Sequence, residues 1–272
     1  MGFTEEANTN YLKPKGINGV VLIDDIHNND YASTGNLASL YTDLESLGYS
    51  PFYISDFTDM DEAFQYGNYL IMTAPYQDLP QADITSIVTW AESGTRGILL
   101  ASRGDFASVS FTSMNALLGQ LGADTRVQDD NVYPTDTGGS SAWSTRSSNI
   151  QNTVPGLVTN VNQVAMFSPS SLRFVSSTAD VIIYGDADEY QTDQNTPAPN
   201  TIFDATSDGV GGTSIPLASH EVINVGTTAD KLVVTGTTMW SDFDYPNNLD
   251  NIIFVRNIIN TFKEHIISTD GS

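Results

Sequence analysis

The sequence predicts an α/β fold with a mostly parallel central sheet. Short, continuous apolar runs rich in β-branched residues alternate with longer segments whose apolar residues recur at helical spacing. The alternation runs through residues 19–121, and one more apolar run and one more helical segment close the chain. Strands that are apolar on both faces indicate a parallel sheet covered by helices on both sides.

The first half of the chain supplies most of the predicted sheet. Its strands are expected at residues 19–23, 51–55, 69–73 and 97–101. Its helices are expected at residues 36–47, 83–92 and 114–121, each closely followed by a glycine. In the first of these helices Leu37, Leu40 and Leu44 share one face, which is expected to pack on the sheet.

The second half has a different pattern. Residues 127–162 are dominated by Asp, Asn, Gly, Ser and Thr, which predicts irregular structure. Short β-like runs at residues 164–167, 181–184 and 221–225 predict an antiparallel extension. Residues 231–235 return to the buried-strand type, and residues 251–267 have the clearest helical pattern.

These patterns together predict one domain at residues 18–267. We expect a flavodoxin-like three-layer sandwich with an irregular and β-rich insertion at about residues 128–228. Residues 1–17 are expected to be a flexible arm or linker and residues 268–272 a tail. The length of 272 residues suits one large domain.

The charge balance is strongly acidic. The chain has 33 acidic and 10 basic residues, for a net charge of -23. Such a surface repels phosphates, so nucleic acid is not expected as a partner. Self-repulsion destabilises the fold at low salt and is screened at high salt. We therefore expect a halophilic, archaeal-like protein that is extracellular or lies at the cell surface.

Several classes of protein are excluded by what the sequence lacks. The chain has no cysteine, which excludes disulfides, thiolate metal sites and thiol nucleophiles. No stretch reaches ~18 apolar residues, so membrane insertion is not expected. The start lacks the features of a signal peptide, and Met1-Gly2 is interpreted as an expression start on a mature segment. Other domains of a larger parent protein are therefore candidate partners.

Polar side chains follow the ends of five predicted strands. In parallel sheets, ligands bind outside the carboxyl ends of the strands. The sequence therefore predicts a binding rim made of these residues: Asp25, His27, Asn28, Asp56, Tyr76, Ser102, Arg103, Asp105, Trp240 and Asp242.

A metal site is one interpretation of the first group on this rim. Asp24, Asp25 and Asp30 lie beside His27 within one short segment, and carboxylates with an imidazole can bind a divalent cation. The alternative is that these Asp residues cap the following helix and shape the loop. A divalent cation is therefore a candidate cofactor, and no other cofactor is expected.

No set of catalytic residues is evident. Ser102 follows a strand as a hydrolase nucleophile does, but Leu100 replaces the first glycine of the Gly-x-Ser-x-Gly turn. His27, His220 and His265 are the three histidines, and no spacing brings one of them to Ser102. Glycine-rich motifs that bind nucleotide phosphates are absent from the sequence.

Two weaker patterns point to ligands. Residues 185–190 with Asp193 alternate acids like the start of a calcium loop, but the central Gly and terminal Glu of an EF-hand are missing. Aromatic residues in or beside loops resemble a sugar site, although ordinary packing also explains them. They are Tyr11, Tyr31, Tyr76, Tyr133, Trp143 and Trp240.

Several segments together resemble a known superfamily. They are YLIMTAP, VTWAESG leading to RGILLASRGDF, SMNALLGQLGADTRVQDDNV and the closing KLVVTGTTMWSDFDYPNNLDNIIFVRNIINTF. This order resembles the class I glutamine-amidotransferase-like superfamily, in particular its non-catalytic branch with ThuA-like domains and domains appended to secreted archaeal and bacterial proteins. The resemblance covers residues 19–106 and 231–262.

The resemblance carries expectations of its own. Amidotransferases of this type use a Cys nucleophile after the strand that matches residues 97–101, where this chain has Ser102 or its neighbour. The resemblance thus implies that amidotransferase activity is lost and that the rim remains as a binding cleft. It also implies carbohydrate as a ligand.

The sequence thus favours a non-enzymatic binding or interaction domain of a salt-adapted secreted or surface protein. Carbohydrate or another surface polymer is the candidate ligand. One alternative is a metal-assisted hydrolase that uses the rim carboxylates, and another is a structural subunit of a cell-surface assembly.

Overall fold

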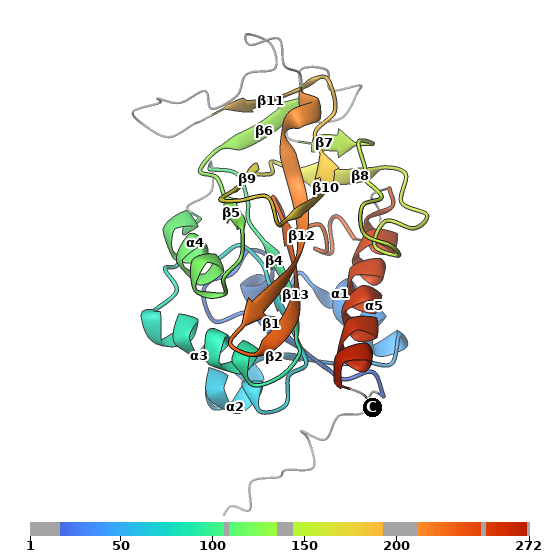
Figure 1. The fold of residues 1–272 in the computed structure, drawn as a ribbon. Helices are drawn as coiled ribbons and strands as arrows, with labels where there is room; N and C mark the ends of the chain where they lie inside the picture. Colours follow the sequence, from blue (N-terminus) through green and yellow to red (C-terminus); the bar gives the residue numbers. More distant parts are fainter. Residues whose placement is uncertain (1–16, 106–108, 135–143, 193–211, 246–248, 271–272) are drawn as a thin grey trace, which may run out of the picture.

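The computed structural model describes residues 17–105, 109–134, 144–192, 212–245 and 249–270 (Figure 1). The expected arm lies outside these ranges except for Ile17. Tyr11, Phe106, Trp143, Asp193 and the last two residues of the expected tail lie outside them as well.

A seven-stranded sheet forms the centre of the molecule, in the order β10-β12-β13-β4-β3-β1-β2. Five neighbouring strands are parallel: β1 (Val20–Asp24), β2 (Ser50–Tyr53), β3 (Tyr69–Met72), β4 (Gly97–Ala101) and β13 (Thr228–Thr235). The ten-residue strand β12 (Pro216–Val225) is antiparallel to β13, and β10 (Asp180–Tyr184) is antiparallel to β12. The predicted α/β fold with a mostly parallel sheet is confirmed.

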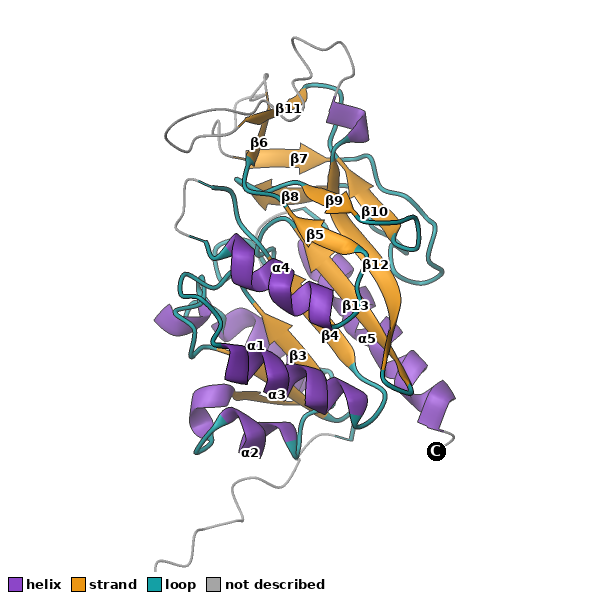
Figure 2. Ribbon diagram, turned by 60° about the vertical axis from the view of Figure 1, so that its left-hand side comes forward, coloured by secondary structure: helices purple, strands orange, loops and turns teal. Residues whose placement is uncertain are grey.

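Helices cover both faces of this sheet (Figure 2). Helices α1 (Ala38–Ser46) and α5 (Asn251–Asp270) pack on one face, and α2 (Met60–Phe64), α3 (Gln81–Glu92) and α4 (Phe111–Gln120) pack on the other. Alternate strand residues point to the two layers, so Val21 and Ile23 join one buried cluster while Val20 and Leu22 join the other. The three-layer sandwich therefore has two cores.

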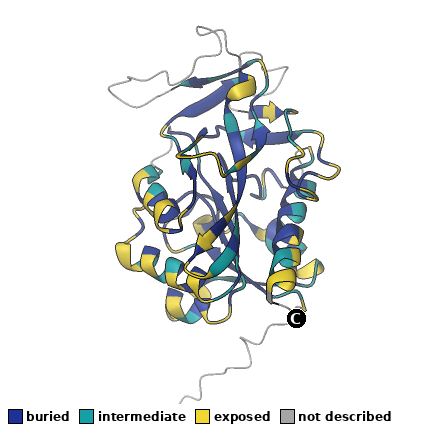
Figure 3. Cartoon of the chain, in the orientation of Figure 1, coloured by how far each residue is buried: buried dark blue, intermediate teal, exposed yellow. Residues whose placement is uncertain are grey.

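The burial pattern explains why these strands could be predicted from the sequence. Strands β1, β3 and β4 are buried along their whole length, while the helices expose one side (Figure 3). Helix α5 continues to Asp270, so part of the expected tail is helical. Among the described helices none is long and apolar enough to cross a membrane.

Within the described ranges, the insertion and the residues just before it form three two-stranded antiparallel sheets. They pair β5 (Thr125–Val127) with β9 (Leu172–Phe174), β6 (Asn131–Pro134) with β11 (Glu189–Thr192), and β7 (Ser144–Ser147) with β8 (Val164–Phe167). The prediction of irregular structure at residues 127–162 was wrong for β6 and β7. Strand β7 reads Ser-Thr-Arg-Ser, so it has no apolar pattern and is held by its partner β8.

One segment of the insertion lies across the carboxyl ends of β4 and β13. We call residues 167–171 the plug. Gly104 N donates to Ser168 O at 2.8 Å, and Ser170 N donates to Gly236 O at 2.9 Å. A Cβ on Gly236 would collide with the Ser170 carbonyl oxygen, so this close approach needs a glycine. The plug therefore occupies the place where a ligand of an open parallel sheet would lie.

Candidate functional site

The loops that follow β1, β3, β4 and β13 meet at one edge of the sheet. We call residues 24–31, 73–78, 102–105 and 236–245 the rim. Asp30 N donates to Ala74 O at 2.8 Å, and the Arg103 guanidinium forms an ion pair with Asp30. The turn after β1 and the turn after β4 thus lie at the same end of the molecule.

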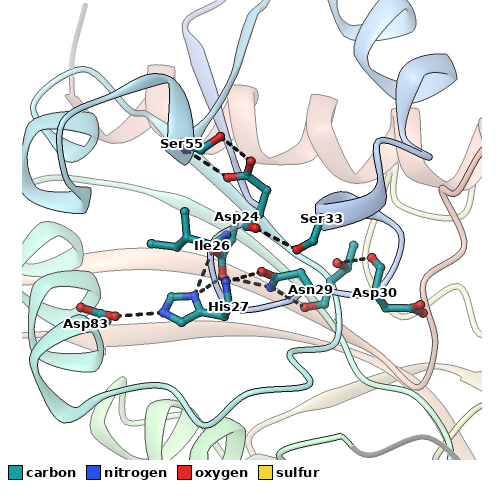
Figure 4. A network of polar contacts seen from close by, with 10 residues as sticks. Asp24, Ile26, His27, Asn29, Asp30, Ser33, Ser55 and Asp83 are labelled. Carbon is teal, nitrogen blue, oxygen red and sulfur yellow. Dashed lines mark hydrogen bonds and ion pairs between the residues drawn. The ribbon is translucent and has the colours of Figure 1, made fainter.

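His27 ties the turn after β1 to helix α3 (Figure 4). Its Nδ1 lies 2.8 Å from Asp24 Oδ2, and its Nε2 lies 2.9 Å from Asp83 Oδ2. Burial lowers the pKa of His27, but hydrogen bonds and charges from Asp24 and then Asp83 outweigh burial, so the pKa is raised above its ordinary value. With both ring nitrogens engaged by carboxylates, His27 connects the end of β1 to helix α3.

Asn29 completes the same network from inside the turn. Its Oδ1 accepts a hydrogen bond from His27 N at 3.0 Å, and its Nδ2 donates to Asp24 Oδ2 at 3.0 Å and Thr73 O at 3.1 Å. The neighbouring Asn28 is exposed and has a φ of 51°, a conformation rare for a residue other than glycine. The turn therefore directs Asn29 inward and Asn28 toward solvent.

Asp30 is the centre of a second buried network. Its Oδ1 accepts a hydrogen bond from the Tyr76 hydroxyl at 2.8 Å, and its Oδ2 pairs with Arg103 Nη1. Burial raises the pKa of Asp30, and the charge and hydrogen bond of Arg103 counter only part of that effect. The Arg103 guanidinium also lies over the Tyr31 ring, 5.1 Å from its centroid.

The carboxylates predicted to bind a metal face different partners. Asp24 holds His27 and Asn29, Asp30 holds Arg103, and Asp25 accepts hydrogen bonds from Ser55 N at 3.0 Å and Ser55 Oγ at 2.5 Å. Within the described ranges, no group of three or more His, Asp or Glu side chains is arranged to hold a metal ion. The described geometry thus corresponds to the loop-shaping interpretation of these residues.

Ser102 is completely buried, and Gly104, two residues further on, hydrogen-bonds to the plug. Its Oγ has one weak contact, with the carbonyl oxygen of Arg103 at 3.5 Å, and no histidine among the described residues hydrogen-bonds to it. Asp105 is also buried, and its backbone N donates to Asp130 O at 3.0 Å. Among the described residues, Ser102 therefore has neither the exposure nor the histidine partner that an activated serine nucleophile needs.

Three residues predicted on the rim have structural roles. Trp240 is completely buried in the core and offers no surface to a ligand. Asp242 caps helix α1, because its carboxylate accepts hydrogen bonds from Ser39 N at 2.6 Å and Ala38 N at 3.1 Å. Asp56 accepts a hydrogen bond from Tyr53 N at 3.0 Å and shapes the turn after β2.

Two aromatic residues at this edge were not among the predicted rim residues. Tyr31 has a φ of 61°, and its ring centroid lies 6.0 Å from that of Phe243, which is 63% exposed. Non-glycine residues with positive φ often lie at ligand-binding sites. We call Tyr31, Tyr76, Arg103 and Phe243 the Tyr31 cluster. The sequence could have pointed to this cluster, because Phe243 lies in the polar Trp-Ser-Asp-Phe-Asp segment after a predicted strand.

In the segment that resembles the start of a calcium loop, Asp186 and Glu189 have roles within the fold. Asp186 accepts hydrogen bonds from Ser148 N at 3.1 Å and Asn149 N at 3.1 Å. Burial, followed by the charges of Asp186 and Asp188, raises the pKa of Glu189 to about 9. Glu189 is therefore protonated at neutral pH and is a poor cation ligand. Tyr133, one of the loop aromatics, is buried.

Comparisons with known proteins inform the fold. No family model and no curated protein matches the chain. A solved structure described as "mmIFT52 N-terminal domain" is similar with a TM-score of 0.67 and 14% identity over 89% of this chain and 97% of that one. A ThuA-like protein from Bacteroides uniformis ATCC 8492 has a TM-score of 0.50 and 12% identity, over 93% of this chain and 92% of that one.

A third solved structure is that of a GMP synthase protein from Thermoplasma acidophilum. Its TM-score is 0.48 at 7% identity, over 91% of this chain and 96% of that one. At these identities the likenesses concern the fold alone. The fold that this chain shares with the first two of these structures is an α/β fold with a mostly parallel central sheet.

Proposed function

We propose that this chain is a non-enzymatic binding domain whose ligand contacts the Tyr31 cluster at the rim. The observation that carries the proposal is that the charged rim side chains already have partners within the protein. Each oxygen of Asp24, Asp25, Asp30 and Asp242 accepts a hydrogen bond. Both nitrogens of His27 are engaged in the same way.

This arrangement disfavours catalysis. A general base needs a lone pair that can take a proton from the substrate, and a metal site needs carboxylates that converge on one point. The rim carboxylates diverge toward separate donors, and Ser102 is completely buried. The exposed residues of the rim are Ile26, Asn28, Gln77, Asp78 and Phe243, and Phe243 is the aromatic residue among them.

The exposed groups fit a carbohydrate. A sugar has an apolar face that stacks on an aromatic ring and hydroxyl groups that hydrogen-bond to amides. Phe243 and Tyr31 supply ring surface, and Asn28 supplies an exposed amide on the turn that contains Tyr31. Tyr31 is also held in place by Arg103, which lowers the entropic cost of binding against its ring.

The charge distribution supports the proposal that the parent protein is secreted or lies at the cell surface in concentrated salt. Two of the few arginines are bonded to acceptors within the protein. Arg256 Nε donates to Asp43 Oδ2 at 2.9 Å, and Arg126 Nη1 donates to Ala123 O at 2.7 Å. Because the chain has 33 acidic and 10 basic residues, carboxylates dominate its charge, and they repel one another less when salt screens them.

The proposal can be tested with a panel of neutral oligosaccharides of glucose, mannose, galactose and N-acetylglucosamine, using titration calorimetry in high salt. We expect at least one to bind, and Phe243→Ala to weaken that binding about tenfold, because a stacked ring contributes about 1 kcal/mol or more. Tyr66→Ala is the matched control, since Tyr66 is 38% exposed and stacks on Phe57 away from the rim.

The result that overturns the proposal is the absence of binding by every saccharide of the panel. Equal binding by Phe243→Ala and the wild-type protein would place the ligand elsewhere and would also contradict it.

A further inference from the structure

Arg103 is the one lysine or arginine among the rim residues, all of which the structure describes. Its side chain is 17% exposed, and that of Asp30 is 7% exposed. The guanidinium pairs with Asp30 and lies on the Tyr31 ring, so the positive charge is directed at two partners within the protein. The pair adds no net charge to the surface that a ligand would meet.

The other charges near this surface are mainly negative. Asp24, Asp25 and Asp242 belong to the rim, and Asp83 lies beside His27. An acidic ligand would therefore be repelled by the negative charges of the rim. Arg103, the cation of the Tyr31 cluster, would not offset this repulsion because Asp30 already neutralises it. Each carboxylate oxygen of Asp24, Asp25, Asp30 and Asp242 already accepts a hydrogen bond from the protein, so these carboxylates attract a cationic ligand less than free ones would.

We infer that Asp30 determines the charge specificity of the rim by cancelling Arg103, so that the site selects uncharged saccharides over acidic ones. This inference rests on the proposed carbohydrate-binding function. Asp30 does not contact the ligand in this account. It acts through Arg103, whose guanidinium would otherwise bind the carboxylate of a uronic acid in a bidentate fashion. Asp30 is thus a specificity-determining residue rather than a ligand contact.

The test compares one neutral oligosaccharide that binds with its counterpart oxidised at C6 to the uronic acid. Both are titrated into the wild-type protein and into Asp30→Asn at moderate salt. We expect the wild-type protein to bind the neutral sugar at least tenfold more tightly. Asp30→Asn should bind the acidic sugar about tenfold better than the wild-type protein does, with a much smaller change for the neutral one.

Two further variants isolate the cause. Asp25→Asn removes the same charge from the rim, but Asp25 pairs with Ser55 and not with Arg103, so the ratio of the two affinities should stay near the wild-type ratio. Adding Arg103→Gln to Asp30→Asn should abolish the gain for the acidic sugar. The gain should also shrink as salt screens the new ionic contact.

Each outcome decides the matter. If Asp30→Asn leaves the affinity ratio unchanged, or if Asp25→Asn shifts it equally, the inference is wrong while carbohydrate binding stands. If neither sugar binds any variant, the proposed function fails and the inference fails with it. If Asp30→Asn does not fold, Arg103→Gln alone provides the test. A tenfold loss of acidic-sugar binding in Arg103→Gln would show that the charge was available to ligands and would contradict the inference.

Discussion

His27 and Asp83 are 56 residues apart in the sequence, and His27 Nε2 lies 2.9 Å from Asp83 Oδ2. Because Asp83 lies in the first turn of α3 and His27 in the turn after β1, this contact fixes the turn against the helix layer. The same imidazole contacts Asp24 at the end of β1. The geometry of the rim therefore depends on a histidine held between two carboxylates.

The raised pKa of His27 makes stability depend on pH. The contribution of His27 is fully present below its ordinary pKa of 6.5 and is lost as pH rises through the raised folded pKa. We expect the free energy of unfolding of the wild-type protein to fall over that window, and the fall to be smaller in His27→Gln. Denaturant unfolding at constant salt across the window measures both. An equal fall in the two proteins would show that His27 is not charged in the folded state.

His220 has the opposite dependence. It lies on β12 with 5% of its side chain exposed, and burial, followed by the charges of Lys231 and His265, lowers its pKa to about 4. Asp180 lies 3.8 Å away but is half exposed, so its attraction is screened and burial dominates.

The folded state of the wild-type protein thus keeps His220 neutral. Because the unfolded state takes up the proton more readily, the free energy of unfolding falls by about 3 kcal/mol as pH decreases from 6.5 toward 4. His220→Leu should flatten this acid limb of the unfolding curve, as measured by denaturant titrations at a series of pH values. A steep acid limb that persists in His220→Leu would assign the loss to other groups.

Gly104 is expected to be intolerant of any side chain. A Cβ there would collide with Asn131 Oδ1 and lie 2.8 Å from the Ser168 carbonyl oxygen in the plug. Gly104→Ala should destabilise the fold by about 1–3 kcal/mol. Gly119→Ala is the control, because that position lies in α4 with its nearest neighbour at 3.4 Å, and alanine there should stabilise by about 0.5–1 kcal/mol. Equal unfolding free energies for the two variants would mean that the plug is not packed on Gly104.

The excess of 33 acidic over 10 basic residues makes stability depend on salt. Screening shortens the range of carboxylate repulsion to about 3 Å at 1 M salt. We therefore expect the melting temperature to rise as NaCl increases from about 0.1 M to about 3 M. A melting temperature that does not change over this range, in scans at fixed pH, would argue against salt adaptation.

The parallel part of the sheet could be predicted because its strands are buried on both faces. A run such as residues 97–101 has no polar position to obscure the pattern. Strand β12 was predicted only from Glu221 onward, since Ser219 and His220 interrupt the apolar pattern of its first half. Ser219 and Glu221 are satisfied by long-range contacts, for example Glu221 Oε1 with Thr125 N at 2.8 Å, which a single sequence does not reveal.

The rim was predictable where its residues are neighbours in sequence. Asp24, His27 and Asp30 belong to one turn, so their proximity was evident, but their partners Asp83 and Arg103 come from other elements. Exposure was harder to predict than position. Trp240 is buried and Phe243 is exposed in the same loop, because the path of the backbone over the sheet decides which aromatic side chain points inward.

Hydrogen exchange of the whole chain, with and without the neutral oligosaccharide that binds best, tests most directly where the ligand lies. We expect slower amide exchange in residues 24–31 and 236–245, which carry Tyr31 and Phe243, and no change in α2 or α3 away from the rim. Protection confined to those helices, with none in the two rim segments, would contradict the account.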